Sequence, residues 1–335
     1  MVKGKVWPWL RLLGGLGILA LLSWRLGTGA FLDGLRVIDA GTLLLAAGIG
    51  LLITVCSAGR WCLVARGMGL ALPLSGAIAD YYRAIFLNAA LPGGVLGDVH
   101  RAVRHGREVA DVGRGVRAVV LERTAGQIVL FAVAAAVLLT LPVPAPAGLL
   151  TAARIGTGVV VLLAAVVVLT AVFRRRRQQR RRQQRHAAPA AGRSWWARAV
   201  ERTGADLRGG LLARRSWPGV VVLSTLALGG HLATFLVAAR AAGSSAPLHQ
   251  LAPLMVLALL AMAVPLNVGG WGPREGVTAW AFGAAGLGAG LGLTVAVVYG
   301  LLALTASLPG AAVLVVRGLR RLSAARRRVR LQPAT

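Results

Sequence analysis

The chain has 335 residues, of which 57% are hydrophobic and only 14% charged, and long apolar runs recur along it. This composition excludes a soluble globular protein and is typical of an all-α polytopic membrane protein. The formal net charge of +28 would suggest nucleic-acid binding in a soluble protein, but the Lys and Arg residues cluster between the apolar runs and in the tail. Basic loops of this kind follow the positive-inside pattern and attract anionic headgroups, so we expect membrane lipids, and no nucleic acid, as partners.

Neither the cysteines nor the histidines indicate a metal site. Cys56 and Cys62 lie in one apolar run without the spacing of metal ligands, and we interpret them as small packing residues. The five histidines are scattered and form no H-E-x-x-H pair. We find no nucleophile-base-acid group, kinase signature or pair of catalytic carboxylates in a suitable context. We therefore predict no metal, no cofactor and no catalytic residue.

In chain order, the apolar runs predict six full transmembrane helices. These spans begin at Leu10, Thr42, Val116, Leu149, Val220 and Gly290. The first span also resembles a signal peptide with a weak cleavage site at Thr28-Gly29-Ala30, and we favour an uncleaved span. The second span ends near Arg60 and Arg66, which we interpret as its cytoplasmic exit.

Two strongly basic segments flank the later spans. Residues 174–216 open with R-R-R-R-Q-Q-R-R-R-Q-Q-R and contain Trp195-Trp196, which belong either to an interfacial helix or to a solvated loop. Residues 317–335 form a basic tail. Six spans place both basic segments and both termini in the cytoplasm. We therefore expect residues 1–335 to form a single multi-pass domain in a bacterial cytoplasmic membrane.

Two further segments are interrupted by helix breakers. Residues 91–101 read L-P-G-G-V-L-G-D-V-H-R, and residues 264–275 read V-P-L-N-V-G-G-W-G-P-R-E. The prolines at these structural breaks are Pro92, Pro265 and Pro273. The apolar runs on either side of the second break are each too short to span a bilayer core of about 30 Å. An irregular backbone at membrane depth is tolerated only where it is buried in protein or lines a wet cavity, so we expect broken or re-entrant helices that face a cavity.

The two broken segments correspond to each other in sequence. Arg101 and Arg274 each follow the first proline of their segment by nine residues. The topology is consistent only if each segment returns to the side it entered from, the first from the cytoplasm and the second from outside. Such an inverted repeat is the architecture of alternating-access transporters, with the binding site between the halves. The alternative is coincidence in a chain rich in Gly and Arg.

Charged and small residues of these segments form the predicted substrate-binding site. Ionisable side chains at membrane depth are costly and usually face a bundle interior or a pathway. Arg101 and Arg274 are predicted to hold an anionic headgroup, because the guanidinium fork matches phosphate and stays charged in any surroundings. The other candidates are Asp98, Glu122, Arg123, Asn267, Glu275, Gly93, Gly94, Gly97, Gly269, Gly270 and Gly272.

These candidates have different expected roles. The glycines would let backbone N–H groups approach a phosphate closely. Asp98 and Glu275 would pair with the arginines in the empty site or contact an amine of the headgroup, and Glu122 would lock one conformation through an arginine elsewhere in the bundle. Asn267 is a candidate polar contact, and Trp271 is a candidate interfacial anchor. The alternative is that each acid and arginine only neutralise one another at a bend.

Three motifs carry a family resemblance: residues 91–101, L-E-R-T-A-G at 121–126, and P-L-N-V-G-G-W-G-P-R-E-G at 265–276. On these motifs, most of the chain resembles the lysylphosphatidylglycerol synthase transmembrane, or flippase-like, family of bacterial and archaeal membrane proteins. Leu96 departs from the family pattern, which has a glycine there before Gly97 and Asp98. In the best-known members this membrane region is thought to move a modified phospholipid between leaflets, while a separate cytosolic domain attaches the amino acid. Other members look like stand-alone proteins linked to glycolipid or polyprenyl-phosphate pathways.

The resemblance implies a lipid flippase, or an accessory to one, and does not imply synthase activity, because the chain ends soon after its last span. The expected substrate is an anionic or amino-modified lipid, namely a phospholipid, a glycolipid or a polyprenyl-phosphate. The alternatives are a membrane-embedded lipid-modifying enzyme such as a glycosyltransferase, or an accessory scaffold for one. An enzyme of the same lipid-modification pathway is an expected partner, and the sequence leaves the oligomeric state open.

Overall fold

The computed structural model describes residues 29–91, 94–141, 216–263 and 271–330, together with single positions between 151 and 210. Every regular element in this part of the chain is an α-helix, which confirms the predicted all-α class. The helices are α2 (Gly29–Arg36), α3 (Ala40–Gly67), α4 (Leu74–Ala90), α5 (Leu96–Glu108), α6 (Val112–Thr140), α9 (Trp217–Ala241), α10 (Leu248–Ala263), α11 (Pro273–Ala284), α12 (Ala289–Ser307) and α13 (Pro309–Arg330).

Four stretches of the described chain are long and apolar enough to cross a membrane. They are α3, α6, α9, and α12 continued into α13 as far as Leu319. They correspond to the second, third, fifth and sixth predicted spans. The predicted spans that begin at Leu10 and Leu149, and most of the basic segment 174–216, lie outside the described residues. Of the most apolar stretch in the span that begins with α12, 61% is buried within the protein, against 17–33% for the other three spans. We therefore regard α12 as the central helix.

Local capping explains where two of the spans begin. The Asp39 side chain accepts a hydrogen bond from the Thr42 backbone N–H at 2.7 Å and caps α3. Asp111 caps α6 in the same way, by accepting from the Arg114 N–H at 2.8 Å. A carboxylate at this position satisfies an N–H group that has no partner within the helix. Hydrogen bonds from Thr42 also lower the pKa of Asp39, which keeps this cap ionised.

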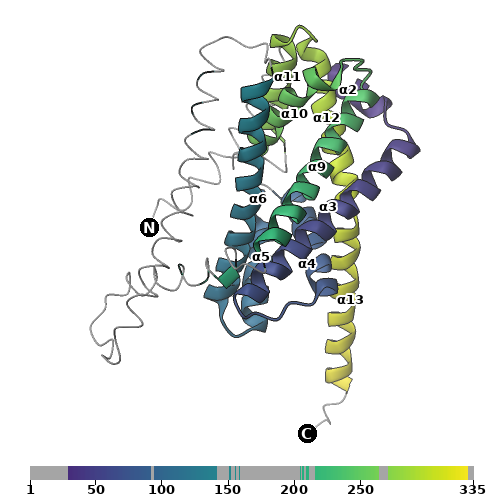
Figure 1. Ribbon diagram of the computed structural model, residues 1–335. Helices are drawn as coiled ribbons and strands as arrows, with labels where there is room; N and C mark the ends of the chain where they lie inside the picture. Colours follow the sequence, from purple (N-terminus) through teal and green to yellow (C-terminus); the bar gives the residue numbers. More distant parts are fainter. Residues whose placement is uncertain are drawn as a thin grey trace, which may run out of the picture.

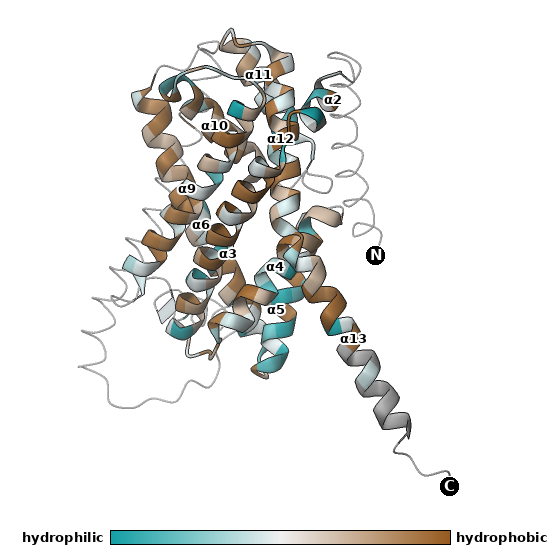
Figure 2. Cartoon of the chain, turned by 90° about the vertical axis from the view of Figure 1, so that its right-hand side faces the viewer, coloured by the Kyte–Doolittle hydropathy of each residue, from teal (hydrophilic) through white to brown (hydrophobic). Residues whose placement is uncertain are grey.

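Both predicted breaks are present in the chain. The first separates α4 from α5, and the second separates α10 from α11, which begins at Pro273. In Figures 1 and 2 the α4–α5 pair and the α10–α11 pair lie at opposite ends of the bundle, and α3, α9 and α12 run between them. Residues 92–93 and 264–270, which include most of both Pro/Gly motifs, lie outside the described residues.

Each end of the bundle has its own hydrophobic core. One core gathers buried residues of α9, α10, α11 and α12 around Phe235, Phe282 and Tyr299. The other gathers residues of α3, α4, α5 and α6 around Trp61 and Tyr81. Each broken pair is therefore packed into protein, which is the condition for interrupting a helix at membrane depth.

Candidate functional site

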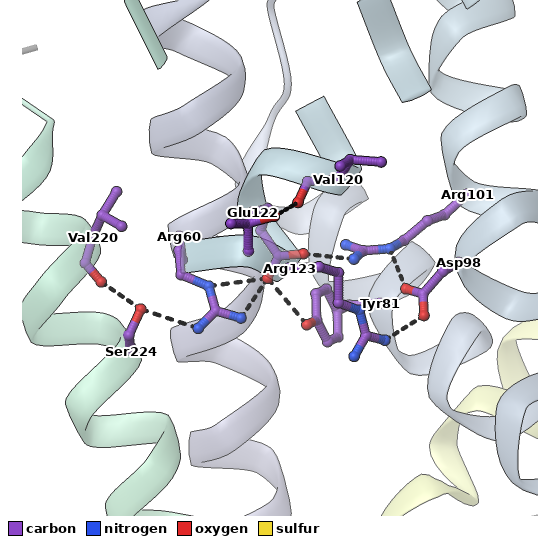
Figure 3. Close-up of polar contacts among 10 residues, drawn as sticks. Arg60, Tyr81, Asp98, Arg101, Val120, Glu122, Arg123, Val220 and Ser224 are labelled. Atoms are coloured by element: carbon purple, nitrogen blue, oxygen red, sulfur yellow. Dashed lines mark hydrogen bonds and ion pairs between the residues drawn. The ribbon is translucent and has the colours of Figure 1, made fainter. Parts of the chain in front are cut away.

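Glu122 on α6 is the centre of a buried charged group at the α4–α5 end, drawn in Figure 3. Its Oε1 accepts from Arg60 of α3, at 3.0 Å from Nε and 2.5 Å from Nη2. Its Oε2 accepts from Arg101 Nη2 of α5 at 2.6 Å. The Tyr81 hydroxyl of α4 lies 3.3 Å from Oε1. One fully buried carboxylate thus joins four helices.

Arg101, one of the two arginines predicted to hold the headgroup, is fully buried beside Glu122. Its guanidinium carbon lies 4.7 Å from the ring centroid of Trp61 and 4.4 Å from that of Tyr81. Its Nε donates to Asp98 Oδ1 at 2.9 Å, one turn earlier on α5. Aromatic rings and carboxylates both favour a cation, and together they allow Arg101 to stay charged away from water.

Asp98 connects this group to the helix break. Arg123, whose side chain is 45% exposed, forms an ion pair with Asp98 Oδ2, and Asn88 Nδ2 donates to the same oxygen at 2.9 Å. Asn88 Oδ1 accepts from the Gly97 backbone N–H at 2.7 Å. One amide on α4 therefore caps the first turn of α5 and orients its acid. We call Arg60, Tyr81, Asp98, Arg101, Glu122 and Arg123 the Glu122 cluster.

The Glu122 cluster carries excess positive charge, and nitrogen atoms with no hydrogen-bond partner in the described part of the chain lie in it and beside it. Its three arginines face two carboxylates, which leaves one positive charge. Among the described residues, no hydrogen-bond partner is present for Arg101 Nη1, Trp61 Nε1 or His105 Nε2, all of them buried. Trp61 contacts both of the others, since its ring lies under Arg101 and edge-on to His105 at 5.4 Å. Guanidinium and indole nitrogens only donate, so the cluster suits an acceptor such as an anionic oxygen.

The second predicted arginine lies at the α10–α11 end in a separate group. Arg274 Nε donates to Glu275 Oε1 at 2.9 Å, and the Gly272 N–H donates to Glu275 Oε2 at 2.6 Å. Gly272 has a φ of +119°, which an L side chain rarely adopts, at the start of α11. The Arg274 guanidinium carbon lies 5.4 Å from the centroid of Trp271 and 5.1 Å from that of Tyr299. Both headgroup arginines thus combine a carboxylate with two aromatic rings.

Helix α9 contacts both groups. Ser224 accepts from Arg60 Nη1 at 3.1 Å and donates to the Val220 carbonyl at 2.7 Å. His231 Nδ1 lies 3.1 Å from the Tyr299 hydroxyl, which belongs to a ring beside Arg274. The two α9 residues are seven apart, so they share a face about 10 Å apart along the helix. One face of α9 therefore carries a polar side chain at each group.

The structure brings together some predicted site residues and separates others. Asp98, Arg101, Glu122 and Arg123 meet in the Glu122 cluster, whereas Arg274 and Glu275 meet at the other end, so the two headgroup arginines do not share one set of contacts. Gly97 packs against α4, where an added Cβ would lie 2.0 Å from the Ala84 carbonyl oxygen. Gly94 has a φ of +60° in the first break. Pro92, Gly93, Pro265, Asn267, Gly269 and Gly270 lie outside the described residues.

Sequence reasoning missed several members of these groups. The sequence interpretation took Arg60 and Arg66 as the end of the second span, whereas α3 continues to Gly67 and Arg60 is buried within it, two turns before its end. The apolar run Trp61 to Ala65 after Arg60 was the available signal. Tyr81, Ser224 and His231 gave no comparable signal, since tyrosine, serine and histidine are common within helices and do not mark a site by themselves.

Metal binding finds no support in the described part of the chain. No three His, Cys, Asp or Glu side chains there are grouped so that they could hold an ion. The acids of both groups are instead engaged by guanidinium groups.

Comparison with known proteins agrees with this architecture. Residues 9–310 match the family model described as the lysylphosphatidylglycerol synthase TM region. No curated protein and no solved structure matches the chain. The family match covers most of the chain and includes both helix breaks and L-E-R-T-A-G at 121–126. The chain therefore belongs to the lysylphosphatidylglycerol synthase TM region family, a family of multi-pass membrane proteins linked to lipid biology.

Proposed function

We propose that the protein moves an anionic or amino-modified lipid across the bacterial cytoplasmic membrane, or presents it for movement. The headgroup binds the arginines at the helix breaks, and the acyl chains stay in the bilayer. The observation that carries the proposal is Arg101, a fully buried guanidinium in a cluster with net positive charge and with Nη1 unpartnered among the described residues. A charged side chain at membrane depth costs at least about 2.5–3.5 kcal/mol, and such residues mark substrate pathways.

A headgroup phosphate can bind Arg101 beside the carboxylates that already contact it. Arg101 donates hydrogen bonds from Nε to Asp98 and from Nη2 to Glu122. A phosphate offers the same kind of anionic oxygens and can bind the remaining face of the guanidinium fork. The excess positive charge of the cluster favours an anion over a neutral headgroup. An amine on the headgroup would contact Asp98, which is partly accessible beside Arg123.

The arrangement of the two groups supports a path between leaflets. They lie at the breaks at opposite ends of the bundle, and α9 contacts both (Figure 1). The α4–α5 end is also where α13 leaves the bundle with its arginines, and basic segments favour the cytoplasm. We therefore place the Glu122 cluster towards the cytoplasmic leaflet and the Arg274 group towards the outer one. A partner enzyme of the same pathway would supply or consume the lipid.

A lipid-modifying enzyme is less well supported by the same contacts. It would use Asp98, Glu122 or Glu275 as a general acid or base. Each of these carboxylates is paired with at least one guanidinium. A carboxylate held in this way is already engaged by a cation, whereas a general acid or base must be within hydrogen-bond reach of the substrate. Charge recognition is the role that the contacts favour.

Transport in vesicles tests the proposal. The protein is reconstituted with fluorescent phosphatidylglycerol, and a membrane-impermeant reductant reports which leaflet holds the label. We expect Arg101→Ala and Arg274→Ala to stop exchange between leaflets. Arg107→Ala is the matched control, since Arg107 is exposed on α5 outside the cluster and its loss removes the same charge. Unchanged exchange in both headgroup variants would reject the site.

A second variant separates binding from folding. Arg101→Ala leaves Glu122 with fewer partners in the interior, which destabilises the protein as well. Arg101→Lys keeps the charge but loses the planar fork that binds two oxygens. We expect this variant to fold and to move lipid more slowly than the wild type. Exchange at the wild-type rate in Arg101→Lys would show that the fork is not used.

A further inference from the structure

A third group of charges lies around Asp80 on α4 and shares no residue with the Glu122 cluster or the Arg274 group. Asp80 is buried, and its Oδ1 lies 2.8 Å from Arg104 Nη1 of α5 and 2.5 Å from Arg317 Nη1 of α13. Arg83 Nη2, one turn along α4, lies 3.5 Å from the same oxygen. Arg104 also donates to Glu108 at 2.8 Å. Three guanidinium groups thus face two carboxylates, and none of these residues was predicted to bind a lipid.

Two of these guanidinium groups are close together and accessible. Arg104 Nη1 and Arg317 Nη1 bind the same oxygen, so they lie within about 5 Å of one another. Their side chains are 30% and 29% exposed, whereas Asp80 is buried behind them. Two like charges held at this separation repel, and one carboxylate oxygen cannot neutralise both. A phosphate can bridge them with separate oxygens.

The surface beside Arg317 is apolar. Val315, Val316 and Leu319 are exposed on α13, and the apolar span that begins at α12 ends at Leu319. Figure 2 shows this mainly brown stretch of α13 where the helix leaves the bundle near α4 and α5. Arginine at the end of an apolar span reaches the headgroup layer. A charged pair flanked by exposed apolar side chains suits an amphiphile better than a soluble anion.

We propose that Arg104 and Arg317 bind the phosphate of an anionic phospholipid at the junction of α4, α5 and α13, with its acyl chains along the exposed apolar side of α13. The lipid neutralises the excess charge around Asp80 and fastens α13 to the first broken pair. This site is independent of the proposed transport path, because its residues are separate from those of the Glu122 cluster. The experiment below can therefore reject this site without rejecting the proposed transport path.

The test compares ligands on the full-length protein in neutral detergent. Thermal unfolding is followed while phosphatidylglycerol, phosphatidylcholine with the same acyl chains, or inorganic phosphate is added. We expect phosphatidylglycerol to raise the melting temperature and phosphatidylcholine to have little effect. In Arg104→Gln/Arg317→Gln, the half-saturating concentration of phosphatidylglycerol should rise by about tenfold per guanidinium lost. High salt should weaken the wild-type response, since the site is partly exposed.

Matched variants make the outcome decisive. Arg66→Gln/Arg107→Gln removes two charges from exposed residues at the ends of α3 and α5, and should respond to phosphatidylglycerol as the wild type does. Arg317→Gln alone leaves Asp80 with Arg83 and Arg104, and should show the single tenfold loss if the double variant does not fold. A wild-type response in the Arg317 variants would overturn the site. An equal response to phosphatidylcholine, or the full response to inorganic phosphate alone, would overturn the lipid assignment.

Discussion

Replacing Glu122 by glutamine tests whether one carboxylate holds the first broken pair in the bundle. Glutamine keeps the shape of the side chain but removes its charge and turns one acceptor oxygen into a donor. Arg60 and Arg101 bind the two oxygens separately, so one guanidinium must then face an NH₂ group. The net charge of the cluster rises from one to two in a buried position.

The expected loss is large because the remaining charges stay buried. Removing one partner of a buried ion pair costs about 3–5 kcal/mol of the free energy of unfolding. At about 2–4 °C per kcal/mol, the melting temperature in detergent should fall by roughly 6–20 °C. Glu108→Gln is the control, since Glu108 is 51% exposed and pairs only with Arg104 among the ion pairs of the described chain. An exposed pair contributes about 0–1 kcal/mol.

A double-mutant cycle separates charge balance from packing. Arg60→Gln together with Glu122→Gln restores the net charge of the cluster, so the double variant should lose less stability than the sum of the two single variants. The measurement is the melting temperature of all three variants in the same detergent. Two results would refute the reasoning: a Glu122→Gln variant that melts like Glu108→Gln, or single effects that simply add.

Three smaller changes test other contacts at the breaks. Gly97→Ala should lower the melting temperature, because its Cβ would lie 2.0 Å from the Ala84 carbonyl oxygen, whereas Gly48→Ala meets nothing within 4 Å and should not. Asn88→Ala should cost about 1–2 kcal/mol by removing hydrogen bonds to Gly97 and Asp98; faster hydrogen exchange in the first turn of α5 would report it, and unchanged exchange would contradict it. Gly300→Ala should slow lipid exchange in vesicles, because its Cβ would lie 2.5 Å from Arg274 Nη2 and 3.0 Å from the Trp271 ring and would displace both. Wild-type exchange in this variant would show that the position of Arg274 is not critical.

The long helices and the breaks could be predicted because each has a local cause. Apolar runs of sufficient length determine α3, α6 and α9 whatever they pack against. Pro273 cannot donate a backbone hydrogen bond and begins α11, and positive φ angles at Gly94 and Gly272 need no partner elsewhere in the chain. Hydropathy and helix-breaking residues therefore locate the long helices and the breaks from neighbouring residues alone.

The pairing of side chains could not be predicted in the same way. Arg60 was interpreted, together with Arg66, as the cytoplasmic exit of its span, and only the packing of α3 shows that it faces Glu122. Ser224 and Tyr81 join the cluster through helices far apart in the sequence, and neither residue type marks a site by itself. Glu122 was identified as a lock that needs an arginine elsewhere, but which arginine depends on how four helices pack.

The two headgroup arginines are related in sequence but differ in how they are held. Arg101 on α5 is bound to Glu122 on α6, so any movement of α5 away from α6 must break that ion pair. Arg274 is bound to Glu275, its neighbour on the same helix, so α11 can move with its ion pair intact. An ion pair to a neighbouring helix therefore holds the first break in the bundle. Among the described residues, no ion pair joins α11 to another helix in this way. Under the proposed function, an anionic headgroup that competes with Glu122 for Arg101 would release the first break and so couple lipid binding to opening at that end.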